Sequence, residues 1–187
     1  MEPEKTALDG SSPELKALCD EYRQNNRIDP ADFDLYNVKR GLRNPDGTGV
    51  MAGLTLICNV HGYLIDDAVR VPDKGCLTYR GIDVNEIVSA CAAENRFGFE
   101  EVCWLLLFGK LPTRRQLDRF CSVLNGCREL PEYFAEDMII KAPSKNVMNK
   151  LARSVLALYS YDDNPDDTSL ENNMRQSIQL IARLPTI

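Results

Sequence analysis

Few side chains in this 187-residue sequence have the type and spacing needed for catalysis. The single histidine, His61, stands beside Gly62 in an apolar stretch. A catalytic or metal-binding histidine needs a partner group, and its sequence neighbours offer neither a nucleophile nor a second metal ligand. We therefore interpret His61 as a surface or structural residue and assign it no catalytic role.

The thiols are more numerous but show no reactive pattern. None of them forms a C-x-x-C pair, the spacing used by zinc sites and redox motifs. Cys91, Cys103 and Cys121 fall on apolar faces of expected helices. We expect reduced thiols, buried as small hydrophobic side chains in a cytosolic protein. The full set is Cys19, Cys58, Cys76, Cys91, Cys103, Cys121 and Cys127.

Residues 44–49, Asn-Pro-Asp-Gly-Thr-Gly, resemble two kinds of binding loop. Oxygen-bearing side chains at alternate positions suggest calcium, but the twelfth position is Thr55 and not the glutamate that a calcium loop requires. The glycine spacing differs from the dinucleotide fingerprint, and no Lys-Ser/Thr pair follows as in a P-loop. The segment is predicted to be a tight turn.

Two charged segments could bind ions. Lys39, Arg40 and Arg43 lie within five residues, but no glycine-rich phosphate loop accompanies them. We expect a solvated loop or a contact to an acidic partner surface. The acidic segment 161–167 contains four aspartates, but it also contains Pro165 and has no spaced partner ligands. It is predicted to be a solvated turn, so no metal site is assigned.

The best-specified elements lie between residues 77 and 126. Asp83 is typical of a helix cap, and the apolar series that begins at Val84 follows it with helical spacing. Residues 102–108 are apolar all round, which predicts a buried helix. Gly109 suits the left-handed position that ends a helix, and Thr113 is typical of the cap of a third helix.

The remaining pattern predicts a mainly α fold with a small β-hairpin near residues 54–79. A strand over 54–65, a turn at Asp66-Asp67 and a returning strand at 69–71 make the hairpin. Further helices are expected after Ser12, at Pro30, at Pro131, after Ser144 as a cap, and from Thr168 or Ser169 to residue 184.

Size and charge limit the possible partners. A chain of 21.1 kDa can bury one domain core. A net charge of −6 and a pI near 4.9 argue against nucleic acid or an anionic membrane as partner. The longest apolar run has seven residues, too few to span a membrane, and the start of the chain is polar and acidic, unlike a signal peptide. We expect a cytoplasmic protein.

Three segments carry a family resemblance. They are Leu-Thr-Tyr-Arg-Gly-Ile-Asp at 77–83, Phe-Glu-Glu-Val-Cys-Trp-Leu-Leu-Leu-Phe-Gly-Lys-Leu-Pro-Thr at 99–113, and Leu-Ile-Ala-Arg-Leu-Pro-Thr-Ile at 180–187. In this order they resemble the amino-terminal half of a citrate synthase of the bacterial type. The resemblance covers residues 53–187 well, and it is weaker at 146–148, where many relatives have a proline before the methionine.

The resemblance implies an incomplete, multi-helix, citrate-synthase-like large domain. Residues 1–50 would form an amino-terminal arm with short helices, and residues 51–187 the amino-terminal part of the large domain. Citrate synthases of the tricarboxylic acid cycle condense acetyl-CoA, a substrate, with oxaloacetate to give citrate and CoA. A carboxylate removes a methyl proton, two histidines assist, and arginines hold the dicarboxylate. In the family these residues lie downstream, so no catalytic, cofactor-binding or metal residue is carried over.

We therefore expect an inactive amino-terminal fragment of such an acyltransferase, which supplies scaffold and a homodimer surface through its large-domain helices. Apolar residues crowd the end of the chain up to Ile187, which suggests an interrupted domain. A fragment of a 2-methylcitrate synthase fits equally well, because the family's acyl-chain choice depends on residues beyond Ile187. Two rivals remain, a non-catalytic helical interaction module and an unrelated helical ligand-binding protein.

Overall fold

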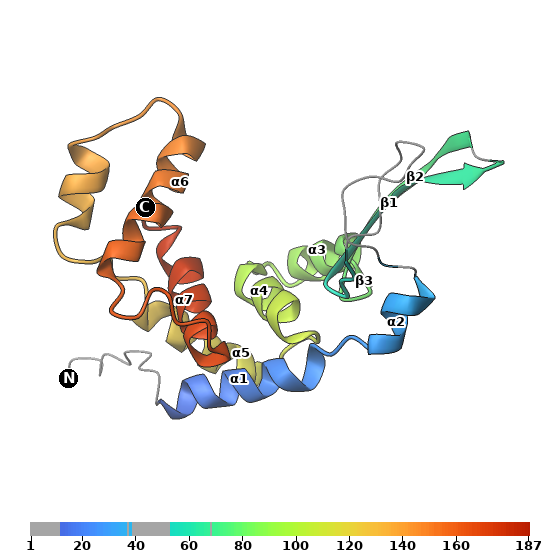
Figure 1. Ribbon diagram of the computed structural model, residues 1–187, viewed down its shortest axis with the longest axis horizontal. Coiled ribbons are helices and arrows are strands. Elements are labelled where there is room, and N and C mark those ends of the chain that lie inside the picture. Colours follow the sequence, from blue (N-terminus) through green and yellow to red (C-terminus); the bar gives the residue numbers. More distant parts are fainter. Residues whose placement is uncertain (1–11, 37, 39–52, 68) are drawn as a thin grey trace. The chain divides into compact units, whose positions relative to one another are not determined.

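The computed structural model describes residues 12–36, 38, 53–67 and 69–187. It is mainly α-helical with one small antiparallel sheet, which confirms the predicted fold class (Figure 1). The helices are α1 Pro13–Asn25, α2 Pro30–Leu35, α3 Val84–Ala93, α4 Phe99–Phe108, α5 Arg114–Gly126, α6 Val147–Leu158 and α7 Leu170–Arg183. The strands are β1 Cys58–Asp66, β2 Val69–Tyr79 and β3 Ile82–Asp83, and two short turns are the π-helical Ala135–Ile140 and the 3₁₀ Tyr159–Tyr161.

Contacts divide the chain into two compact units. We call the unit formed by Met1–Glu21 and Arg114–Ile187 the terminal unit, and the unit formed by Tyr22–Thr113 the central unit. The predicted boundary near residue 50 lies outside the described residues and stays a prediction. The same holds for the predicted turn at 44–49 and for the cations at 39, 40 and 43.

The terminal unit has a core made by one face of each of three helices. Its helix α1 begins where predicted, because the Ser12 hydroxyl accepts a hydrogen bond from the Leu15 amide at 3.2 Å. Helix α5 packs against α7. Burial of a large apolar side chain stabilises a fold by about 1.5–3 kcal/mol, so these faces hold the unit together. The buried side chains are Leu15, Leu18, Cys19, Phe120, Val123, Leu124, Met174, Ile178 and Ala182.

Helix α6 begins two residues later than Ser144 as a cap would place it. The cap is Asn146, whose Oδ1 accepts a hydrogen bond from the Asn149 amide at 2.9 Å. The Ser144 hydroxyl instead accepts from the Asn146 amide at 3.2 Å and shapes the turn before the helix. An asparagine is as good a cap as a serine, so local geometry decided between them.

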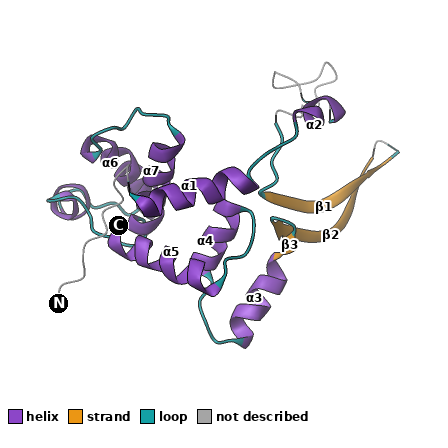
Figure 2. Cartoon of the chain, turned by 90° about the horizontal axis from the view of Figure 1, so that it is seen from below, coloured by secondary structure: helices purple, strands orange, loops and turns teal. Residues whose placement is uncertain are grey.

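The central unit contains the sheet, in the order β1-β2-β3, with both pairs antiparallel (Figure 2). Strands β2 and β3 are joined by Arg80 and Gly81, which both have positive φ, at 51° and 85°. Positive φ at both central residues is the type I′ turn of a two-residue hairpin, which matches the twist of the strands. His61 pairs with Cys76, and Tyr63 pairs with Pro72. A step of two residues along β1 thus corresponds to a step of four along β2, so the irregularity lies in β2.

The helices of the central unit agree only in part with the predictions from the sequence. Asp83 caps α3, as predicted, by accepting a hydrogen bond from the Asn85 amide at 2.8 Å. The apolar face of α3, however, has no buried residue, and Val88 is 60% exposed. Among the described elements, α3 contacts mainly β2 and β3. In α4, Trp104, Leu105 and Phe108 are buried, and Gly109 ends the helix with φ of 82°.

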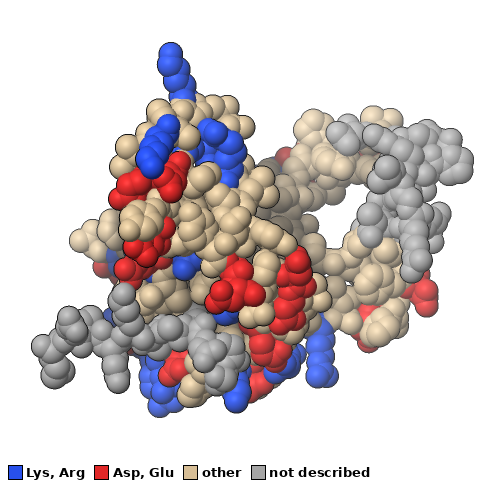
Figure 3. All heavy atoms as spheres, turned by 60° about the vertical axis from the view of Figure 1, so that its left-hand side comes forward, with Lys and Arg blue, Asp and Glu red and all other residues tan. Residues whose placement is uncertain are grey.

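Figure 3 shows the charged side chains on one face of the molecule. There, acidic and basic side chains are interspersed. Within the described ranges, no helix combines the length and the apolar character needed to cross a membrane.

Candidate functional site

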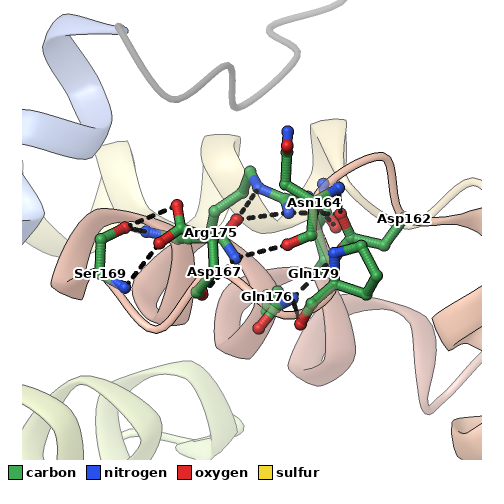
Figure 4. A network of polar contacts seen from close by, with 9 residues as sticks. Asp162, Asn164, Asp167, Ser169, Arg175, Gln176 and Gln179 are labelled. Atoms are coloured by element: carbon green, nitrogen blue, oxygen red, sulfur yellow. Dashed lines mark hydrogen bonds and ion pairs between the residues drawn. The ribbon is translucent and has the colours of Figure 1, made fainter.

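The most connected polar cluster of the terminal unit joins the acidic segment 161–167 to helix α7 (Figure 4). Arg175 Nη2 donates a hydrogen bond to Asp162 Oδ1 at 2.6 Å, and both side chains are about 15% exposed. Gln176 donates to the other carboxylate oxygen, Oδ2, at 3.0 Å. Asp162 is therefore held on both oxygens. The sequence prediction of a solvated turn is wrong for this residue.

Asn172 fixes the shape of the loop before the helix. Its side-chain amide donates to the carbonyl oxygens of Asn164 and Asp167, at 2.9 and 2.7 Å. Its Oδ1 accepts two hydrogen bonds from Arg175. Because Asn172 is only 8% exposed, its polar atoms need these partners. The Asn172 amide and the Arg175 guanidinium together hold the loop against the first turns of α7.

Of the two caps that the sequence allowed for α7, Thr168 and Ser169, the structure has Ser169. Its hydroxyl accepts a hydrogen bond from the Asn172 amide at 3.2 Å and donates to Asp167 Oδ2 at 3.0 Å. Its own amide donates to Asp167 Oδ1 at 2.9 Å. The Asp167 carboxylate thus lies at the positive end of the helix dipole, where a negative charge is stabilised.

A cavity of about 820 Å³ lies beside this network, lined by the end of α6, the 3₁₀ turn, the acidic segment and α7. Its two cations are Arg175 and Arg183. Every nitrogen of the Arg175 guanidinium already donates within the network. Arg183 donates Nε to the Glu129 carbonyl at 3.1 Å, and partial burial lowers the pKa of its guanidinium. The carboxylates that line the cavity are Asp162, Asp163, Asp167 and Glu171.

The hydrogen bonds of this network fit a structural role better than a catalytic one. General acid-base catalysis needs a group whose pKa lies near the working pH and that can reach a substrate. The pKa of Asp162 is instead lowered: burial would raise it, but hydrogen bonds from the Asn164 amide, Gln176 and Arg175 outweigh that effect. The carboxylate stays ionised and paired.

His61 lies in β1, on the hairpin of the central unit. Its Nε2 is 2.7 Å from Asp73 Oδ2 in β2, and both side chains are more than a third exposed. The hydrogen bond from His61 and one from the Lys74 amide lower the pKa of the Asp73 carboxyl. This cross-strand contact agrees with the structural role predicted for the histidine.

The cysteines differ from the prediction of seven buried thiols. Only Cys19 and Cys127 are buried, while Cys58, at the start of β1, is exposed. The other four are half-buried, and all seven are free thiols. Partial burial raises the pKa of the Cys103 thiol, which makes it less reactive. Among the described residues, no group of three or more possible metal ligands comes together.

The Tyr-Arg-Gly segment that the sequence singles out has a structural explanation. Arg80 donates from Nη2 and Nε to the Leu106 carbonyl, at 2.7 and 3.2 Å, and from Nη2 to Asn26. Asn26 in turn donates to the Leu107 carbonyl at 3.0 Å. A guanidinium at the carboxyl end of α4 satisfies carbonyl groups that have no partner within the helix and complements the helix dipole. The motif joins the β2–β3 turn to α4.

The family model described as "Citrate synthase, C-terminal domain" matches residues 46–187. The chain belongs to the citrate synthase family. A citrate synthase of Saccharolobus solfataricus is 30% identical over 115 residues, which cover 62% of this chain and 28% of that protein.

Other members of the citrate synthase family match over longer stretches. A mitochondrial citrate synthase of Citrus maxima is 27% identical over 93% of this chain and 38% of its own length. A 2-methylcitrate synthase of Mycobacterium tuberculosis is 27% identical over 81% of this chain and 33% of its own length. The chain thus spans between a quarter and two-fifths of the length of these relatives.

A solved member of the family shares the fold. The crystal structure of citrate synthase from Pyrobaculum aerophilum superposes with a TM-score of 0.56 at 27% identity, over 80% of this chain and 38% of that one. The helical architecture implied by the sequence resemblance is therefore confirmed.

The hydrogen bonds between the acidic segment and α7 were not predicted from the sequence. Asn172, Arg175, Gln176 and Gln179 recur at helical spacing on α7, on a side different from the buried Met174 and Ile178. A polar stripe on a helix that directly follows an acidic loop is the signal that could have indicated the network.

Proposed function

We propose that this chain forms part of the helical framework of an enzyme that condenses an acyl-CoA with oxaloacetate. The family match over residues 46–187 carries this proposal. Relatives named citrate synthase and 2-methylcitrate synthase match with similar identity, so acetyl-CoA and propionyl-CoA are both candidate acyl donors. Acetyl-CoA would serve as substrate of the whole enzyme and not as a cofactor held by these residues.

We also propose that these 187 residues alone do not catalyse the reaction. The mechanism expected from the resemblance needs a carboxylate base and two histidines at one site. This sequence has one histidine, and its imidazole is paired with Asp73 on an exposed hairpin. The polar network on α7 is saturated by its own hydrogen bonds. The chain's role is to position other parts of the enzyme.

Activity of the isolated chain gives the first test. The chain is incubated with oxaloacetate and either acetyl-CoA or propionyl-CoA, and the tricarboxylate product is quantified by mass spectrometry. A thiol reagent is unsuitable as the only readout, because the seven cysteines would react with it. We expect product at the level of a blank without protein. Turnover at an enzymatic rate would contradict the inactive role.

The native polypeptide gives the second test. An antibody raised against this chain captures the protein from its source cell, and the intact mass and synthase activity of the captured protein are measured. We expect activity with acetyl-CoA or propionyl-CoA. If the captured protein is inactive with both substrates, the enzymatic proposal fails and a non-catalytic interaction role replaces it. Cell fractionation with the same antibody tests the proposed cytoplasmic location.

We also propose a homodimer formed through the large-domain helices, with α6 as the contact surface. Met148, Ala152 and Leu156 recur every fourth residue and are exposed; Met148 and Leu156 are 73% and 75% accessible. Two α6 helices packed antiparallel about Ala152 would bring the acidic segment 161–167 of one copy toward the start of α6 in the other, which Lys145 precedes. Apolar contact and charge complementarity both favour this arrangement.

A further inference from the structure

Strand β1 is the unprotected edge of the three-stranded sheet. In the part of the chain that the structure describes, β2 is the only strand paired with β1, and eight of the nine β1 residues have a partner in it. An edge strand presents main-chain N–H and C=O groups that can pair with another strand, so proteins usually protect such edges.

The proline, the lysine and the irregular stretch that could protect this hairpin lie on β2. That strand contains Pro72, which cannot donate to a ladder, and Lys74, and it holds the irregular stretch between Pro72 and Cys76. Strand β1 has no proline, lysine or arginine and keeps a regular two-residue advance through His61 and Tyr63. With respect to the described residues, the edge of β1 is therefore regular and open to a further strand.

Exposed apolar side chains accompany this open edge. Val60, Leu64 and Ile65 are 78%, 53% and 73% exposed. A two-stranded ribbon is only marginally stable in water, and an added strand covers apolar surface and completes main-chain hydrogen bonds.

The sequence of β1 is complementary to itself. If two copies pair antiparallel with Gly62 opposite Gly62, Val60 of one copy lies opposite Leu64 of the other, on the same face. The carboxylates of the two Asp66 residues would then be eight residues apart along the pair, about 27 Å at the usual strand rise. That distance exceeds the screening length at physiological salt, so these charges would not oppose pairing.

We propose that β1 is an interaction surface for β1 of a second copy of this chain. The two hairpins form a four-stranded antiparallel ribbon in the order β2-β1-β1-β2, with a two-fold axis at Gly62. This contact is separate from the α6 surface and does not depend on the catalytic proposal.

Cross-linking tests the register. In Gly62→Cys, the two new thiols would face each other across the axis, where opposite Cβ atoms lie about 4.5–5.5 Å apart. Gly75→Cys is the matched control, because Gly75 is on β2 and a Cβ has open space at both glycines. Under mild oxidation we expect several-fold more covalent dimer from Gly62→Cys than from Gly75→Cys or the unaltered chain, in which Cys58 gives the background. Equal yields would overturn the proposal.

Hydrogen exchange tests the pairing without oxidation. All proteins in this experiment also carry Leu156→Lys, which removes the proposed α6 contact. We expect the β1 amides to exchange more slowly as the protein is concentrated. Leu64→Lys should abolish this change, whereas Val71→Lys, its cross-strand neighbour on β2, should retain it. The absence of any concentration dependence in β1, or an equal loss in both lysine variants, would contradict edge pairing.

Discussion

At the scale of single residues, Asp162 is a carboxylate on which burial and hydrogen bonding act in opposite directions. Burial raises its pKa, but hydrogen bonds from the Asn164 amide, Gln176 and Arg175 bring the net value below that of a free aspartate. A carboxyl whose pKa is lower in the folded than in the unfolded chain stabilises the fold when it is ionised. Asp162 therefore contributes stability above the unfolded pKa of about 4.

We expect Asp162→Asn to lower the free energy of unfolding by about 1 kcal/mol at neutral pH, because a charge-assisted hydrogen bond to Arg175 is lost. The stabilisation by Asp162 disappears as the pH falls through its folded pKa, so the variant should lose less stability than the unaltered chain below about pH 4. Urea unfolding at several pH values measures both effects. Asp163→Asn, at an exposed neighbour, should change little; equal effects of both variants would exclude a specific role for the ion pair.

Unlike Asp162, Ser154 has a buried polar group that no hydrogen bond satisfies among the described residues. Its side chain is fully buried in α6, and its Oγ has no hydrogen-bond partner among the described residues. Ser154→Ala should raise the free energy of unfolding by about 1 kcal/mol, because it removes an unsatisfied polar group and improves helix propensity. Thermal unfolding checks this. Ser144→Ala should be destabilising, because the Ser144 hydroxyl bonds to the Asn146 amide.

At the scale of elements, the junction between α4 and the end of α1 depends on Gly109. Its φ of 82° is left-handed, and a Cβ there would lie 2.9 Å from the Asn25 Cβ. We expect Gly109→Ala to cost about 1–3 kcal/mol, from backbone strain and from the displaced neighbour. Chemical denaturation measures the loss. Gly53→Ala, where nothing lies within 4 Å, is the control, and a comparable loss there would refute the steric explanation.

The same junction explains why the Tyr-Arg-Gly motif and the α4 sequence occur in the same chain. The type I′ turn places Arg80 where its guanidinium reaches the last carbonyls of α4. Both segments could be predicted as elements from the sequence. Their connection could not, because residues 80 and 106 have no sequence relation that indicates contact.

At the scale of the whole molecule, the proposed α6 surface predicts the association state. Leu156→Lys places a charge in the exposed apolar stripe of α6, where pairing would have to desolvate it. We expect this variant to weaken dimerisation at least tenfold in sedimentation equilibrium, with unchanged circular dichroism. Val88→Lys, at a comparably exposed position on α3, should not. If both variants sediment like the unaltered chain, α6 is not the interface.

Two kinds of prediction from the sequence were correct for local reasons. Helix boundaries set by Ser12, Asp83, Gly109 and Ser169 rest on hydrogen bonds or backbone angles within a few residues. The order of the three family segments was sufficient to predict the citrate synthase family, because each is a fixed combination of residue types.

The predictions that were wrong concern burial. Spacing identified an apolar face on α3 but could not show which element covers it, and the described structure leaves Val88 exposed. Composition suggested buried thiols, yet Cys58 lies on an exposed edge strand. The acidic segment looked solvated because its cation, Arg175, lies 13 residues away on the next helix.

The sequence by itself determined the helical class, most helix caps and the family, since these depend on residue type and short-range spacing. Only the tertiary structure decided that Asp162 is paired, that Arg80 binds the end of α4, and that β1 lies at the edge of the sheet. Pairing and burial depend on distances between segments that are remote in the chain, and one sequence does not encode those distances in any local pattern.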